Sequence, residues 1–255
     1  MTASTAVGDL VLDRLRQVRA QVEQLDRRLE SGRQGAHRLI EALKLVAMGE
    51  LIPDGLGDMV DRAVGRAREA NTDAMSTLDE IIGSGPRAAE AAAEFARVWT
   101  DISAQAQGVG DDVDGSKSRL EAHWTGDAAT RYFGIVGNQS QAARRVAEIA
   151  RQAATACADM AEATKIFNLA VLAAVATYVG TVVVALEMIV TIAGIVPGVA
   201  ALVQAVVSYT NDLIRARDAF FARQDKQATM LAGLARSPEG FAGPGGTWPQ
   251  AVKAP

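Results

Sequence analysis

The side chains that could carry catalytic chemistry are few in this sequence of 255 residues, and their spacing does not bring them together. His37 and His123 are its two histidines, and each stands in a charged, helix-forming context. Cys157 is the single cysteine and lies in an alanine-rich window, which suits a small buried residue. The acidic pairs Asp79-Glu80 and Asp111-Asp112 are adjacent in sequence, and neighbours on a helix face different directions. We therefore expect no enzyme, no cofactor and no metal centre.

One segment, Gly110 to Glu121, partly fits the pattern of a calcium-binding loop. It offers carboxylates at the third, fifth and twelfth positions and Gly115 at the sixth, where such loops turn sharply. Gly110 stands where the first carboxylate should be, and Lys117 replaces the expected apolar residue. The alternative, which we favour, is a polar loop in which Asp114 or Ser116 caps the helix that follows.

Charge and composition exclude further classes. The net charge is −4 with the two signs interspersed, so the sequence offers no basic surface for nucleic acid. The first eight residues contain neither a basic region nor an apolar stretch. If the protein is secreted or reaches the cell envelope, we expect a route that needs no cleaved signal peptide.

The elements that must position any site are predicted to be helices, because aromatic residues make up only 5% of a sequence rich in Ala, Leu, Arg, Glu and Gln. A heptad seam begins the chain, and a partner helix must cover it: Val11, Leu15, Val18, Val22, Leu25 and Leu29. The apolar pattern is disturbed at 31–35 and then resumes, and glycine- and proline-containing stretches predict helix breaks at 53–57, 83–86 and 108–112. The predicted fold is all-α, an elongated bundle of long antiparallel helices. We expect N-terminal amphipathic helices in 1–107, a helical hairpin continuing into a long apolar hairpin in 108–236, and a flexible tail in 237–255.

A run of 46 residues, Ile166 to Asn211, contains a single charged side chain, Glu187. The uncharged stretches on either side of Glu187 are 21 and 24 residues long, and each is long enough to span a membrane as a helix. Gly194, Pro197 and Gly198 predict a turn that makes the run an apolar hairpin. Such a hairpin would place Glu187 across from Gln204, within reach of a hydrogen bond. The alternatives are a hairpin buried in the bundle and one covered by an oligomer, a partner or lipid.

A second turn signal is Trp124-Thr125-Gly126. Leu120, Trp124, Ala128 and Tyr132 recur every four residues across it. Glycine tolerates left-handed backbone angles, so Gly126 lets the chain reverse while the indole of Trp124 packs across the corner. Asp127 follows where a helix N-terminus favours a carboxylate. This predicts a helix-turn-helix hairpin; the plainer alternative is an ordinary helical corner with a buried aromatic.

The stretch from Ser118 to Phe133, with Trp124 and Gly126 at its turn, resembles the Trp-x-Gly family of helical-hairpin proteins exported by type VII secretion systems of actinobacteria and related bacteria. The resemblance covers about 80 residues and implies a non-enzymatic exported protein that assembles with a second chain. The family's export signal, Tyr-x-x-x-Asp or Glu, is absent, because the stretch from Tyr209 to Leu213 has its acid one position early. Export would then depend on a partner that carries the signal, or the likeness is one of fold alone.

Three functions follow from these features. The first is an exported or envelope-associated helical protein that assembles through its apolar hairpin and inserts it into, or presents it to, a membrane. The second is an α-helical pore-forming protein that hides the hairpin in its soluble state. The third is a resident membrane protein with two spans. In each we expect a homo-oligomer or a heteromer with another helical-hairpin chain, with a membrane as a further partner and no nucleic acid.

Overall fold

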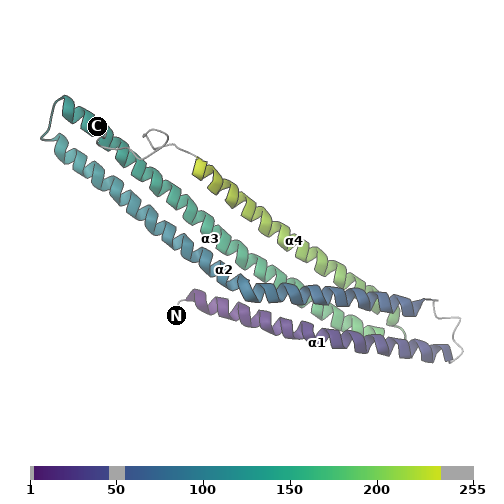
Figure 1. The fold of residues 1–255 in the computed structure, drawn as a ribbon. Helices are drawn as coiled ribbons and strands as arrows, with labels where there is room; N and C mark the ends of the chain where they lie inside the picture. Colours follow the sequence, from purple (N-terminus) through teal and green to yellow (C-terminus); the bar gives the residue numbers. More distant parts are fainter. Residues whose placement is uncertain (1–2, 46–54, 237–255) are drawn as a thin grey trace. The chain divides into compact units, whose positions relative to one another are not determined.

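The computed structural model describes residues 3–45 and 55–236, and within these ranges the chain is helical apart from Gly55 and the connections 122–126 and 190–194. Four long helices follow one another in antiparallel order: α1 (Ala3–Leu45), α2 (Leu56–Glu121), α3 (Asp127–Ile189) and α4 (Ile195–Arg236) (Figure 1). The described residues contain no strand, and the all-α prediction is confirmed. The predicted tail, 237–255, lies outside the described residues.

The helices form two compact units, and each unit is built from segments far apart in sequence. Of the described residues, the first contains those up to Arg87 together with Thr164–Phe221, and the second contains Ala88–Ala163 together with 222–236. Helices α2, α3 and α4 therefore each continue from one unit into the other. This division differs from the sequential one expected at residues 107 and 108, because long antiparallel helices bring distant segments together.

The first unit is a four-helix bundle with one continuous apolar core. The predicted seam of α1 is confirmed, since Leu15, Val18, Val22, Leu25 and Leu29 are all at most 2% exposed. The side chains that cover it come from α2, α3 and α4, among them Val60, Leu78, Val175, Val182 and Leu202. Burial of a whole side-chain stripe on each helix, more than intrinsic helix propensity, stabilises helices of this length.

Two of the predicted helix breaks are wrong, because α2 runs through 83–86 and 108–112. Helix α1 also runs unbroken through 31–35, where the apolar pattern is disturbed. Buried residues such as Ile81 and Ala89 lie on both sides of 83–86, so packing outweighs the local glycine and proline preferences. That site instead coincides with a unit boundary, which falls directly after Arg87.

The second unit packs α2 against α3 through small residues. The Ser103 hydroxyl donates to the carbonyl of Ala147 at 2.8 Å, and the Ser140 hydroxyl donates to that of Gly110 at 3.3 Å. A Cβ at position 110 would lie 3.2 Å from Cγ of Arg144, a tight contact with α3 that glycine avoids. On α4, the Gln227 amide donates to Asp159 of α3 at 2.8 Å.

Candidate functional site

The Trp124-Thr125-Gly126 segment lies between α2 and α3, where the chain reverses. Helix α2 ends at Glu121, and the amides of His123 and Trp124 both donate to the Leu120 carbonyl, at 3.0 and 2.9 Å. Gly126 has a φ of 105°, in the region that favours glycine. Its carbonyl accepts the Thr130 amide at 3.0 Å and so begins α3, with Asp127 in the first turn.

Three aromatic rings gather at this corner. Trp124 lies 5.3 Å from Tyr132 and 5.7 Å from Phe133 between ring centroids, and Tyr132 and Phe133 are 5.7 Å apart. The Trp124 residue is 40% exposed and both of its ring partners belong to α3, so the indole covers the start of one helix rather than filling a buried junction. Leu120 on α2 is 41% exposed. Trp124 is therefore not the buried aromatic of the plainer alternative.

Trp124→Ala should lower the free energy of unfolding by about 1–3 kcal/mol, since it removes two aromatic pairs worth about 0.5–1.5 kcal/mol each and little buried area. Trp124→Phe keeps a ring in contact with Tyr132 and Phe133 and should lose less. Urea unfolding followed by circular dichroism measures both. A loss above about 3 kcal/mol for Trp124→Ala would show that the indole is buried as a core residue is.

The apolar hairpin turns earlier than predicted. Helix α3 ends at Ile189, and the turn spans 190–194, with the Thr191 amide donating to Met188 and the Gly194 amide to Thr191. Helix α4 begins at Ile195, so Pro197 lies in its first turn, where the missing amide hydrogen leaves no helical bond unmade. Gly194 and Gly198 are both buried, and at each position a methyl group would lie within 3.0 Å of a main-chain oxygen of α3.

This shift moves Glu187 away from its expected partner. Glu187 is two residues from the end of α3 and borders a surface pocket with Arg28, Ser31 and Gly32 of α1. Gln204 lines a different pocket beside Thr177 and Thr181, and its side-chain amide donates to Ser208 at 3.2 Å. The predicted hydrogen bond between Glu187 and Gln204 is therefore wrong.

Much of the apolar run is exposed. Nine bulky apolar residues of the α3–α4 hairpin, which we call the outer face, are at least 42% exposed: Ile166, Leu169, Val184, Val190, Ile192, Val196, Val207, Ile214 and Phe221. On α3 they are spaced by 3 and 15 residues and on α4 by 11, 7 and 7, each close to a whole number of helical turns, which places them along one side of each helix. Among the described helices, α3 contains a stretch long and apolar enough to cross a membrane, and 44% of that stretch is buried. The bundle thus covers less than half of it. Helix α4 would be the second span of the two-span membrane protein, but it contains no stretch that is both long enough and apolar enough to cross a membrane.

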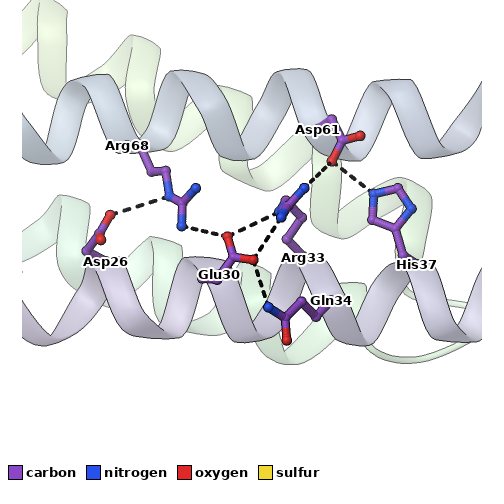
Figure 2. A network of polar contacts seen from close by, with 7 residues as sticks. All are labelled: Asp26, Glu30, Arg33, Gln34, His37, Asp61 and Arg68. Carbon is purple, nitrogen blue, oxygen red and sulfur yellow. Dashed lines mark hydrogen bonds and ion pairs between the residues drawn. The ribbon is translucent and has the colours of Figure 1, made fainter.

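The opposite side of the first unit, formed by α1 and α2, is charged. Figure 2 shows its polar network, in which Arg68 reaches both Asp26 and Glu30 while Arg33 pairs with Glu30 and Asp61. The His37 ring lies 2.9 Å from the Asp61 carboxylate. Hydrogen bonds from Arg33 and Gln34 lower the pKa of Glu30 to about 2. The first unit therefore has one ion-paired side and one apolar side.

Acid should weaken the α1–α2 contact. The pKa of Glu30 is lower in the folded protein than in the unfolded chain, so its contribution to stability is present above about pH 4.5 and is lost as the pH falls toward about 2. Glu30→Gln removes the carboxylate charge at every pH. The difference in the free energy of unfolding between wild type and variant should therefore shrink as the pH falls from about 4.5 toward about 2. Denaturant unfolding at a series of pH values measures it. Parallel profiles for the two proteins would contradict this assignment.

Two tyrosines join the α1–α2 side to the α3–α4 side. The Tyr178 hydroxyl donates to the carbonyl of Ala67 at 2.6 Å, and the Tyr209 hydroxyl donates to Asp73 at 3.0 Å. Their rings lie 5.1 Å apart, and burial raises the pKa of both phenols. They act as neutral donors in the core, a role that sequence reasoning missed because an isolated tyrosine in an apolar run gives no sign of its partner.

Sequence reasoning also missed the role of Gly32 and Gly35. A methyl group at position 32 would lie 2.7 Å from Cδ2 of Leu186, and one at position 35 would lie 2.9 Å from Cγ1 of Val190. These glycines let α1 approach the end of α3 closely. Their place inside an otherwise regular heptad pattern was the available signal, because glycine within a helix often marks close packing.

The remaining candidates do not form a site. Residues 110–121 belong to helix α2, so they do not form a calcium-binding loop. Asp114 lies within this helix and pairs with Arg144, so it does not cap a helix either. Over the described part of the chain, no group of three or more metal-ligating side chains comes together. Cys157 is partly buried, and burial raises the pKa of its thiol.

No family model and no curated protein matches the chain. Among solved structures, a de novo designed helical repeat protein aligns with 84% of this chain and 96% of its own length, at 16% identity and a TM-score of 0.18. Similarity this low supports no argument about fold or function.

Proposed function

We propose that this protein is a non-enzymatic, exported or envelope-associated helical protein of the type VII substrate kind, which uses its apolar hairpin for assembly or membrane contact. The observation that carries the proposal is the Trp124-Thr125-Gly126 corner between two long helices, with Gly126 at a φ of 105°. The same three-residue turn between antiparallel helices characterises the family that the sequence around Trp124 resembles. The exposed outer face supports the second part, since monomers seldom leave so long an apolar surface uncovered.

The test is export from an actinobacterial host that has type VII systems. We expect a tagged copy of the full chain to enter the culture medium or the envelope fraction, and to stay inside an otherwise identical strain that lacks the secretion ATPase. Co-expression with candidate helical-hairpin partners asks whether export needs a second chain. Equal distribution in the two strains would overturn the type VII assignment.

A pore-forming role is the second candidate, and the asymmetry of the first unit favours it. The ion pairs of Figure 2 lie within the α1–α2 pair, whereas the described hydrogen bonds from Tyr178 and Tyr209 join that pair to α3 and α4. An apolar hairpin held mainly by apolar contacts loses few polar bonds when it separates from its cover. Release of a trapped dye from liposomes at protein concentrations that leave the chain soluble would support this role; intact liposomes would count against it.

A further inference from the structure

We propose that two copies of this chain pair through the groove between α1 and the end of α3, with Arg28 of each copy against Glu187 of the other. The inference rests on the assembly role proposed for the apolar hairpin, and it specifies the surface and the partner. The pair is two-fold symmetric, so the same patch is used on both copies and each contact occurs twice.

The groove is a hollow of about 290 Å³ with an apolar floor and a charged residue on each helix. Its lining includes Arg28 and Gly32 of α1, and Val183, Leu186, Glu187 and Val190 at the end of the α3 side. A Cβ at position 32 would lie 2.7 Å from Cδ2 of Leu186, so glycine lets this leucine pack directly on the α1 backbone. Close packing sets the shape of the floor, and the groove needs no rearrangement to receive a partner.

The two charged residues of the groove are unpaired within the chain. Arg28 and Glu187 are both exposed, and no hydrogen bond or ion pair joins either of them to another described residue. By contrast, Arg19 and Arg33 of the same helix α1 each pair with a carboxylate of α2. A patch with one free cation and one free anion complements its own copy, because a two-fold axis brings each charge to the opposite charge of the partner.

Exposed apolar side chains continue from the edge of the groove. Val184 precedes Glu187 by three residues, so the two are neighbours on the surface of α3. Val184, Val190 and Ile192 are each at least 46% exposed. Together with the floor they form an apolar centre next to the charged pair, which is the usual composition of a protein interface. Because the patch is small beside the about 800 Å² per partner of a standard interface, we expect a dissociation constant on the order of 10 μM.

A second copy satisfies both charges of the groove, which an apolar partner or the interior of a bilayer does not. Either of these would take water from Glu187 without supplying a donor, and a buried carboxylate without a donor is costly. In the two-fold pair the same contact that covers the apolar centre brings a guanidinium to each carboxylate. Exclusion of water also strengthens the attraction between the charges, which is weak for an ion pair on an open surface.

The test is the mass of the full chain in sedimentation equilibrium over about 1–300 μM, a range that brackets the expected dissociation constant. We expect wild type to pass from monomer to dimer. Arg28→Glu and Glu187→Arg should each weaken the dimer at least about tenfold, because each places like charges together at both contacts. Arg27→Glu makes the same charge change at the neighbouring exposed residue, which does not line the groove, and should dimerise as wild type does.

Mixing the two weakened variants separates a contact between copies from one within a chain. One variant then offers two carboxylates and the other two guanidinium groups, so both contacts between them join opposite charges. We expect the mixture to form a dimer at concentrations where each variant alone is a monomer. An ion pair within one chain cannot be restored by mixing, and a mixture that stays monomeric would overturn the inference. Circular dichroism checks that each variant is folded.

Two further results would also overturn it. If Arg28→Glu and Glu187→Arg dimerise as wild type does, the copies meet through another surface and the assembly role stands. If wild type stays monomeric throughout, no second copy covers the groove, and flotation of that monomer with phosphatidylglycerol vesicles would assign the hairpin to lipid instead. Export is measured separately in the strain that lacks the secretion ATPase, so failure of the inference and failure of the type VII assignment are distinguishable.

Discussion

Tyr178→Ala is expected to lower the free energy of unfolding by about 3–5 kcal/mol, the range for removal of a large buried aromatic side chain. Tyr178 is 1% exposed and is the largest fully buried side chain of the core. Its ring lies 5.1 Å from that of Tyr209 on α4 in a tilted arrangement, while its hydroxyl reaches Ala67 of α2, so a single side chain on α3 contacts two other helices. Thermal or urea unfolding followed by circular dichroism measures the loss.

Tyr178→Phe separates the contribution of the packed ring to stability from that of the hydroxyl hydrogen bond. It keeps the packing volume and removes one donor to a main-chain oxygen, for which we expect a loss of about 1–2 kcal/mol. If both variants lose equally, the hydroxyl carries the stability and the packing argument is wrong. Tyr209→Phe is the matched variant across the ring pair, because its hydroxyl reaches an exposed carboxylate and should contribute less.

The all-α architecture could be predicted from the sequence because it follows from local patterns that packing reinforces. The heptad from Val11 to Leu29 identified a buried stripe, in which Val11 is partly buried and the other predicted core residues are buried. The reversal at Trp124 to Gly126 was also visible, because a left-handed glycine leaves a local signature. Both predictions depend on neighbours close in sequence.

What the sequence could not reveal depends on contacts between distant segments. The breaks expected at 83–86 and 108–112 are overridden because α2 packs along its length against other helices. The turn of the apolar hairpin was placed at Pro197, yet proline is also compatible with the first turn of a helix, and α4 begins before it. That difference of a few residues changed the neighbour of Glu187 from Gln204 to the α1 side of the bundle.

The division of the first unit into a charged and an apolar side also depends on tertiary structure. The amount of apolar sequence was evident, but the share left exposed depends on how many helices cover it. Leu186 and Ile189 are buried against the bundle, whereas Val184 in the same helix and Val190 directly after it are about half exposed. The exposed half supports the proposed envelope role.

Gly198→Ala should destabilise the protein by about 1–3 kcal/mol, the range for an added methyl group that forces a close-packed backbone to move. The new methyl would lie 2.7 Å from Cγ1 of Ile189 and 2.9 Å from the carbonyl oxygen of Ala185. Side chains can rotate away from such a contact, but a helix carbonyl cannot move without displacing its own hydrogen bond. The first turn of α4 would have to separate from the last turns of α3.

Gly180→Ala is the control for this prediction, because glycine is replaced by alanine on α3 where no atom lies within 4 Å of the new methyl. Alanine is the better helix former by about 1 kcal/mol, so this variant should be more stable than wild type. Opposite signs for the two variants in urea unfolding would show that close approach at the hairpin, not helix propensity, requires Gly198. A Gly198→Ala protein as stable as wild type would mean that α4 does not meet α3 as closely as this packing requires, and the position of the turn at 190–194 would then need revision.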